Sequence, residues 1–257
     1  MSQLSQITKV YANAKLTLTL EVLGQRPDKM HEICSEMVTV NLSDELLINP
    51  LGDGLKISGV YKEQLIDTPQ KENLITKALK AVNKKAFVCV DKNIPVKAGL
   101  GGGSADAAAI LRWANVKDEK LAASLGADIP FCMIGGRAKV KGIGEIVESL
   151  AFKKREFVLF LLPFGIETKL VYEAYDEGYK SLGQNALETA AFKVEPRLKA
   201  WSDYLKGLTG QRPKLAGSGS TLFYDDNANA LGFNQGIEGP FGRAKVIDVT
   251  TIDAYSY

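Results

Sequence analysis

The segment 94–106, Ile-Pro-Val-Lys-Ala-Gly-Leu-Gly-Gly-Gly-Ser-Ala-Asp, restricts the possible folds of this 257-residue chain more than any other segment. A strand-like stretch at 86–90 precedes it, and the alanine-rich residues 104–114, which favour a helix, follow it. Its four glycines can adopt positive φ and let the backbone approach a ligand without Cβ clashes. The unpaired N–H groups at the start of the helix favour an anion. The segment therefore predicts a phosphate-binding loop between a strand and a helix.

The spacing of these glycines does not fit two common phosphate-binding motifs. The dinucleotide pattern Gly-x-Gly-x-x-Gly begins at Gly99 and Gly101 but meets Ser104 where the third glycine is required. A Walker A loop needs Gly-Lys followed by Ser or Thr, and the chain contains no Gly-Lys pair. Two alternatives without a ligand stay open at this point, a flexible glycine turn and helix capping by Ser104 or Asp106.

The composition limits the kinds of partner. Hydrophobic residues make up 46% of the chain and charged residues 24%, close to an ordinary globular protein. Lys and Arg number 32 against 30 Asp and Glu, which gives a net charge of +2 with no dense basic run. We expect no nucleic-acid or membrane partner, because such proteins usually carry a concentrated positive patch. Local geometry, not overall charge, must then hold an anionic ligand.

The cysteines and the apolar runs indicate a cytoplasmic protein. Cys34, Cys89 and Cys132 are odd in number and widely spaced, so they predict reduced thiols and neither a disulfide framework nor a zinc site. The N-terminal ten residues have no apolar stretch of signal-peptide length. The most apolar run, 157–163, is too short to cross a bilayer.

The order of the expected elements is α+β in two halves, without the regular βαβ alternation of a doubly wound sheet. Alternating apolar and polar residues over 16–22 predict a half-buried strand. We expect one domain over 1–152 and a second over 153–257. Further strands are expected at 38–42, 45–48, 86–90, 155–162, 215–224 and 245–249, and helices at 72–82, 104–114, 118–125, 168–179 and 188–208, the last interrupted by Pro196.

The glycine segment resembles motif two of the GHMP kinase superfamily of small-molecule kinases, in which a Pro-x-x-x-Gly-Leu-Gly-Gly-Gly-Ser loop holds the phosphates of ATP. Residues 12–18 (Ala-Asn-Ala-Lys-Leu-Thr-Leu) resemble motif one, and residues 215–220 (Leu-Ala-Gly-Ser-Gly-Ser) resemble motif three. Residues 24–33 resemble a segment of one branch, whose members phosphorylate a cytidine diphosphate-linked methylerythritol. The matches extend in order over nearly the whole chain. The others are 72–74 (Glu-Asn-Leu), 125–131, 142–145 and 185–188.

The resemblance implies a fold, a reaction and its cofactors. The fold would be the two-domain architecture with a ribosomal-protein-S5-like N-terminal domain and a ferredoxin-like C-terminal domain, with the active site between them. The reaction would be ATP- and Mg²⁺-dependent phosphorylation of the 2-hydroxyl of that small molecule in the non-mevalonate isoprenoid pathway. We expect a monomer or a weak homodimer. The residues implied to bind ATP are Pro95, Val96, Lys97, Ala98, Gly99, Leu100, Gly101, Gly102, Gly103, Ser104 and Ala105.

Lys15 and Asp128 are the catalytic residues that the resemblance implies. Lys15 would place a cation near the transferring phosphoryl group and help to keep Asp128 ionised. Asp128 would accept the proton of the alcohol and would also contact the substrate, since phosphoryl transfer needs mainly positioning and charge neutralisation. The alternatives from the residues alone are a solvated surface lysine and an aspartate that caps a helix before Pro130.

Thr17, Met30 and His31 are the other implied substrate contacts. His31 would exchange hydrogen bonds with the cytosine, and as the only histidine it excludes a multi-histidine metal site. The chain departs from the family at Asn13, where proline is usual, at Thr17, where the family has Asn, and at Met30, where a Tyr stacks on the cytosine. The metal ligands stay open. The rival functions are another GHMP kinase of the homoserine or mevalonate type and a non-catalytic nucleotide-binding relative.

Overall fold

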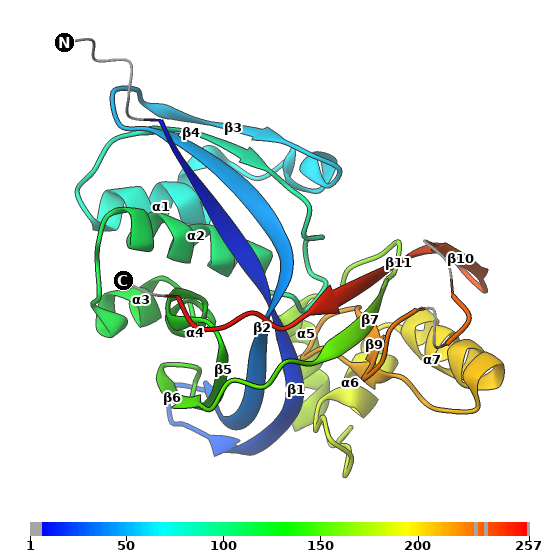
Figure 1. Ribbon diagram of the computed structural model, residues 1–257. Helices are drawn as coiled ribbons and strands as arrows, with labels where there is room; N and C mark the ends of the chain where they lie inside the picture. The colour runs from blue at the N-terminus through cyan, green and yellow to red at the C-terminus, as the bar shows by residue number, and fades with distance from the viewer. Residues whose placement is uncertain (1–6, 229–230, 234–235, 256–257) are drawn as a thin grey trace.

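A long β-hairpin forms the centre of the first sheet. The computed structural model describes residues 7–228, 231–233 and 236–255. In it β1 (Thr8–Gln25) has 18 residues and pairs antiparallel with β2 (His31–Asn49), which has 19 (Figure 1). The expected strands at 16–22, 38–42 and 45–48 were therefore too short. The register of the hairpin shifts at three points, and each shift breaks the alternation of side chains while the strand continues.

The first sheet has the order β3-β4-β2-β5-β6, with β1 paired to β2 outside this path. β3 and β4 run parallel, and the other pairs are antiparallel. The other strands of this sheet are β3 (Gly54–Ser58), β4 (Phe87–Asp91), β5 (Arg137–Gly142) and β6 (Ile146–Leu150). The helices of this part are η1 (Lys62–Leu65), η2 (Gln70–Glu72), α1 (Leu74–Ala81), α2 (Gly102–Trp113), α3 (Glu119–Leu125) and α4 (Ile129–Ile134).

Local sequence explains where these helices begin. Asn73 caps α1 by accepting a hydrogen bond from the Ile75 N–H, and Asp118 caps α3 in the same way. The alanines of α2 allow it to lie close to the sheet, and residues 105–111 are all buried. Helices were predicted at all three places. No helix was predicted at α4, because its six residues are too few to show a helical period.

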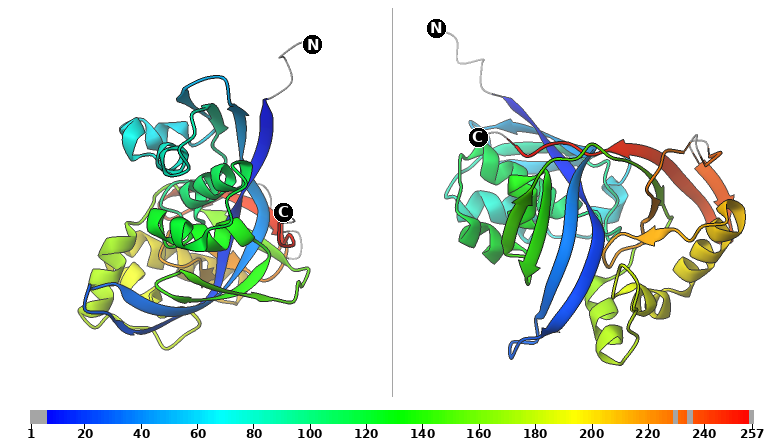
Figure 2. Two further views of the ribbon diagram at one scale, coloured as in Figure 1. Left: turned by 90° about the vertical axis from the view of Figure 1, so that its left-hand side faces the viewer. Right: turned by 60° about the horizontal axis from the view of Figure 1, so that its bottom comes forward.

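The second sheet has the order β10-β11-β7-β9-β8, and all its pairs are antiparallel. Three helices pack against this part of the molecule (Figure 2), and the predicted break at Pro196 separates two of them. The strands are β7 (Glu156–Leu161), β8 (Lys214–Leu215), β9 (Leu222–Tyr224), β10 (Gly236–Gly239) and β11 (Gly242–Thr250). The helices are α5 (Thr168–Asp176), α6 (Glu188–Val194) and α7 (Pro196–Thr209).

The predicted single strand at 215–224 is wrong, because a loop divides it into β8 and β9. Gly217 in this loop has φ +63°, which favours glycine and is incompatible with a continuous strand. The Ala216 N–H donates to the Thr221 carbonyl at 3.0 Å and closes the loop. The apolar residues that precede and follow this loop led to the prediction of one continuous strand.

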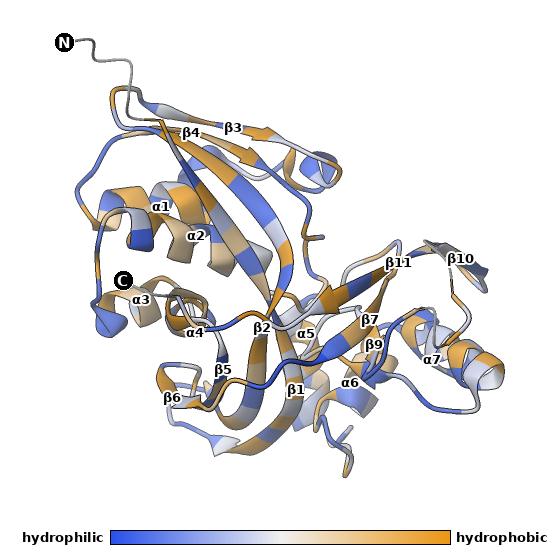
Figure 3. Cartoon of the chain, viewed as in Figure 1, coloured by the Kyte–Doolittle hydropathy of each residue, from blue (hydrophilic) through white to orange (hydrophobic). Residues whose placement is uncertain are grey.

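The described residues form three hydrophobic cores, and the third joins the two sheets. Figure 3 shows hydrophobic residues along α2 and β4, which face the first core. The third core packs Leu16 and Val38 of the first sheet against Phe157 and Phe223 of the second. Residues 14–18 are consequently all buried. The expectation of a half-buried strand is wrong here, since β1 is covered on both faces.

The end of the chain returns to the first sheet. β-bridges join Thr251 to Val40 and Ala254 to Gly135, so the segment after β11 lies beside α4 (Figure 1). Within residues 7–228, 231–233 and 236–255, no helix combines the length and the apolar character that a membrane crossing requires.

Candidate active site

The glycine-rich loop connects β4 to α2, as the sequence predicts, and borders a cavity of about 350 Å³. Lys97, Gly99 and Gly101 all have positive φ, and Gly101 occupies the N-cap position of α2. Gly101 is the N-cap residue, and no side chain caps this helix, so neither Ser104 nor Asp106 has a capping role. The alternative of a capping role for these two residues is therefore wrong.

Nine of the eleven loop residues predicted to bind ATP line this cavity. Leu100 and Ala105 do not, because their side chains are buried in hydrophobic cores. Leu100 lies in the core between the two sheets and so anchors the middle of the loop. The nine that line the cavity are Pro95, Val96, Lys97, Ala98, Gly99, Gly101, Gly102, Gly103 and Ser104.

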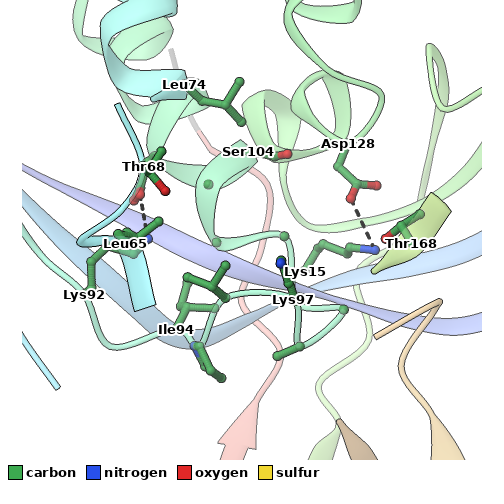
Figure 4. A pocket seen from close by; sticks show the side chains of 18 of the residues that line it. Lys15, Leu65, Thr68, Leu74, Lys92, Ile94, Lys97, Ser104, Asp128 and Thr168 are labelled. Atoms are coloured by element: carbon green, nitrogen blue, oxygen red, sulfur yellow. Dashed lines mark hydrogen bonds and ion pairs between the residues drawn. The ribbon is translucent and has the colours of Figure 1, made fainter. Parts of the chain in front are cut away.

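Lys15 and Asp128 meet at one side of the cavity (Figure 4). The Lys15 Nζ lies 3.4 Å from the Asp128 Oδ2 and donates to the Thr17 Oγ1 at 3.2 Å. The Lys15 side chain is only 8% exposed, which excludes the alternative of a solvated surface lysine. Asp128 stands at the N-cap of α4 but makes no capping hydrogen bond, so its carboxylate faces Lys15 instead.

The loop between β8 and β9 closes the cavity from the second sheet. A Cβ on Gly219 would lie 1.9 Å from the Gly99 nitrogen, so the two loops touch backbone to backbone. The Ser218 and Thr168 hydroxyls are 2.9 Å apart, and both residues line the cavity. Asn185 fixes the loop by donating to the carbonyls of Leu215 and Gly217 at 3.0 and 2.7 Å.

A buried group of charges that was not predicted from the sequence lies beneath the glycine loop. The Lys92 ammonium pairs with Asp44 and, at 2.6 Å, with Asp106. The three side chains are between 0% and 5% exposed. Burial raises the pKa of the Asp106 carboxyl to about 7, against the lowering effect of the Lys92 charge and with the help of the Asp44 charge. We call these three residues the buried triad.

The raised pKa of Asp106 predicts an unusual dependence of stability on pH. An ordinary Asp ionises near pH 3.8, so between that pH and about 7 the folded state binds more protons than the unfolded state. The contribution of Asp106 to the free energy of unfolding is therefore greatest at low pH and is lost as the pH rises to about 7. Relative to Asp106→Asn, we expect the wild type to lose about 2 kcal/mol between about pH 5 and about pH 8, measured by urea unfolding.

Asp118→Asn is the matched control for this pH experiment, because Asp118 is an exposed helix cap outside the cavity. Asn caps a helix as well as Asp does, so this variant should keep the pH dependence of the wild type. Equal pH slopes in the wild type and Asp106→Asn would contradict the raised pKa of Asp106.

His31 lies at the far end of the hairpin and packs on α5. Its ring stacks on Tyr172 with centroids 4.6 Å apart, and its Nε2 is 2.7 Å from the Asp176 Oδ1. Burial raises the pKa of the Tyr172 hydroxyl, and the negative charge of Asp128 raises it further. His31 and Met30 do not border the glycine-loop cavity, and the Met30 side chain is half exposed in the turn before β2.

Two kinds of comparison agree with this geometry. The family model "GHMP kinases N terminal domain" matches residues 73–136, which include the glycine loop and Asp128. The chain is 36% identical to the 4-diphosphocytidyl-2-C-methyl-D-erythritol kinase of Carboxydothermus hydrogenoformans, over 83% of this chain and 86% of that relative. It is 33% identical to the enzyme of the same name from Clostridium kluyveri, over 86% of this chain and 92% of that relative.

Solved structures show the same relationship. A crystal structure of 4-(cytidine 5'-diphospho)-2C-methyl-D-erythritol kinase matches with a TM-score of 0.72 and 30% identity, covering 95% of this chain and 99% of that one. Homoserine kinase from Cytophaga hutchinsonii matches with a TM-score of 0.62 at 13% identity over 99% and 97%, a likeness of fold alone.

The fold and the cavity thus define a kinase of the two-domain GHMP type, which confirms the predicted fold class. Such a kinase uses ATP as the phosphoryl donor. Within that class, the chain belongs to the 4-diphosphocytidyl-2-C-methyl-D-erythritol kinase family.

Proposed function

We propose that this chain transfers the γ-phosphoryl group of ATP to the 2-hydroxyl of 4-diphosphocytidyl-2-C-methyl-D-erythritol. The products are the 2-phosphate and ADP, and the reaction belongs to the non-mevalonate route to isoprenoid precursors. The observation that carries the proposal is the Lys15–Asp128 pair, 3.4 Å apart, at the wall of the cavity that the glycine loop borders. It supports the proposal because it provides a candidate base and a cation next to the loop that would bind the phosphates.

Each of the two residues has a chemical role. Asp128 accepts the proton of the attacking hydroxyl. At the same time the hydroxyl oxygen bonds to the γ-phosphorus, and the bond between that phosphorus and the leaving oxygen of ADP breaks. Lys15 stabilises the negative charge that spreads over the transferring group. Thr17 accepts a hydrogen bond from Lys15 at 3.2 Å, so its role here is to orient that ammonium.

The end of the site formed by His31 and α5 suits a nucleobase on the acceptor. The stacked His31 and Tyr172 rings offer an aromatic face with a hydrogen-bonding edge, and Asp176 fixes the orientation of the imidazole. Met30 stands beside His31 and can cover an apolar face of a base. The negative charge of Asp128 raises the pKa of the Tyr172 hydroxyl, which supports the proposal that one acceptor extends from Asp128 to the stacked rings.

We propose that Mg²⁺ enters this cavity as a partner of the nucleotide. No cluster of three or more His, Cys, Asp or Glu side chains within the described ranges is arranged to hold a metal ion. Mg²⁺ needs few protein ligands when phosphate oxygens and water complete its octahedron. The Ser104 hydroxyl, which lines the cavity and does not cap α2, is the oxygen that we propose to contribute. The ion would neutralise charge on the triphosphate.

The proposed domains, 1–152 and 153–257, both contribute to the cavity. The glycine loop, Lys15 and Asp128 come from the first, and Thr168 and Ser218 come from the second. All of these residues belong to one chain, so a monomer or a weak homodimer suffices for activity.

Release of ADP in the presence of Mg²⁺ and ATP tests the proposal. We expect turnover with 4-diphosphocytidyl-2-C-methyl-D-erythritol that exceeds turnover with homoserine or mevalonate by at least about 100-fold, because only the first presents a nucleobase to His31. Preferential turnover of homoserine or mevalonate would overturn the assignment of the acceptor. Binding of ATP with no turnover of any of the three would indicate the non-catalytic relative instead.

A further inference from the structure

We propose that Lys92 is a positioning residue for the nucleotide, and that the buried triad holds the two ends of the glycine loop at the separation that ATP binding requires. The inference rests on the proposed kinase function only in taking the bound ligand to be ATP or ADP. Binding of ADP can be measured without any acceptor, so failure of the acceptor assignment would leave this test intact.

The triad connects both ends of the loop. Lys92 directly follows β4, where the chain enters the loop, and Asp106 lies in α2, where the chain leaves it. Their 2.6 Å ion pair therefore closes the base of the loop across 14 residues. Both residues also line the cavity, so the closure is adjacent to the ligand and not in a remote core.

Asp44 adds a third point of attachment from β2. Its Oδ1 accepts hydrogen bonds from the backbone N–H groups of Asn93 and Ile94, at 2.5 and 2.8 Å, and so fixes the chain just before the loop. A Cβ added to Gly102 would lie 3.4 Å from the Asp44 Oδ2, which places this carboxylate directly against the first turn of α2. One carboxylate thus contacts the strand side and the helix side of the loop.

Stability alone does not account for such a cluster. Removing three charges from water costs more than their pairing commonly returns, and apolar residues of similar volume often stabilise a core as well or better. The Asp106 Oδ1 is buried without a hydrogen-bond partner, which adds to this cost. A well-defined arrangement of the loop is the benefit that the geometry offers in return.

The charge of the triad also excludes direct attraction of the phosphates. With both carboxylates ionised, one ammonium leaves a net charge of −1 next to the site for a polyphosphate, and protonation of Asp106 would bring it only to neutrality. We therefore assign the effect of the triad on ATP to the position of the loop. Lys15 lies in β1 and touches the loop where its backbone N–H donates to the Leu100 carbonyl at 3.0 Å, and Asp128 lies at the N-cap of α4. Because β1 and α4 hold these two residues, a disturbed loop should impair nucleotide binding more than it impairs the acceptor.

The test compares nucleotide affinity with folding in Lys92→Met and Asp106→Asn. We expect each to raise the Kd for ADP, measured by calorimetry, and the KM for ATP by at least about tenfold. The KM for the acceptor should stay within about threefold of the wild type. Asp106→Asn keeps the shape of the side chain and serves if Lys92→Met does not fold.

Leu205→Ala is the control for a purely structural effect. Leu205 is fully buried in α7, in the core of the second sheet and away from the cavity, so its truncation should lower the Tm without changing the Kd for ADP. Folded Lys92→Met or Asp106→Asn protein that binds ADP as the wild type does would overturn the proposal. An equal loss of affinity for ADP and for the acceptor would overturn it as well, since it would reveal a general disturbance of the site.

Discussion

Asp128→Asn is expected to lower kcat at least about 100-fold while the KM for ATP stays within about threefold. The amide keeps the size of the carboxylate but cannot take the proton of the attacking hydroxyl at neutral pH. It also removes the negative charge that faces the Lys15 ammonium at 3.4 Å. ATP contacts depend on the glycine loop, which this substitution does not touch, so the loss should fall on the chemical step. Steady-state release of ADP at saturating ATP and acceptor measures it.

Asp118→Asn is again the matched control, since both aspartates stand at the N-cap of a short helix. Only Asp118 uses its side chain as a cap, and Asn replaces it well there. The control should retain the kcat of the wild type. A kcat for Asp128→Asn close to that of the wild type would show that the reaction needs no base at this position, and that Lys15 and the loop provide the catalysis.

The part of the site that depends on neighbours in the chain could be predicted from the sequence. Positive φ at Gly99 and Gly101 and the helix propensity of the alanines after them are local properties. They predicted the strand, the loop and the helix in the right order. The pairing of Lys15 with Asp128, by contrast, entered only through the resemblance, because no local rule joins a strand to a helix over a hundred residues away.

The buried triad left a signal that the sequence analysis did not use. Alternation along β2 places Asp44 on the same face of the sheet as Leu46 and Ile48, which are both fully buried. The alternation alone therefore assigns a carboxylate to an apolar face. Asp106 likewise stands among buried alanines in α2. Two carboxylates on faces turned to one core favour a buried cation as their partner. Which lysine provides it, Lys92, depends on the pairing of β4 with β2 and could not be derived from the sequence.

His31 illustrates the opposite limit. Its stacking on Tyr172 brings together residues from the hairpin and from α5 that are far apart in the sequence. Helical spacing over 168–179 does not distinguish a Tyr172 side chain packed in the core from one that faces the hairpin. The contact exists because the hairpin is long enough to reach α5. The three register shifts interrupt the alternation of side chains, so the alternation did not predict the full length of the two strands.

Gly219→Ala is expected to lower kcat/KM for ATP about 100-fold, the loss that a displacement of about 1 Å can cause at an active site. The added Cβ would lie 1.9 Å from the Gly99 nitrogen and 2.1 Å from the Ala98 carbonyl carbon, so one of the two loops has to move. The φ of Gly219 lies outside the left-handed range that favours glycine. The substitution therefore acts on the close approach of the two loops.

The displacement of the loops by Gly219→Ala should extend to the phosphate site, because a hydrogen bond links the β8–β9 loop to the glycine loop. The Thr221 N–H donates to the Ala98 carbonyl at 3.1 Å, so separating the loops breaks this bond and moves Gly99 at the wall of the cavity. Gly207→Ala provides the matched control, since a Cβ at Gly207 in α7 meets nothing within 4 Å and alanine favours a helix. It should leave the kinetics unchanged and raise the Tm slightly. Wild-type kinetics in folded Gly219→Ala protein would mean that the two loops need not touch for ATP to be positioned.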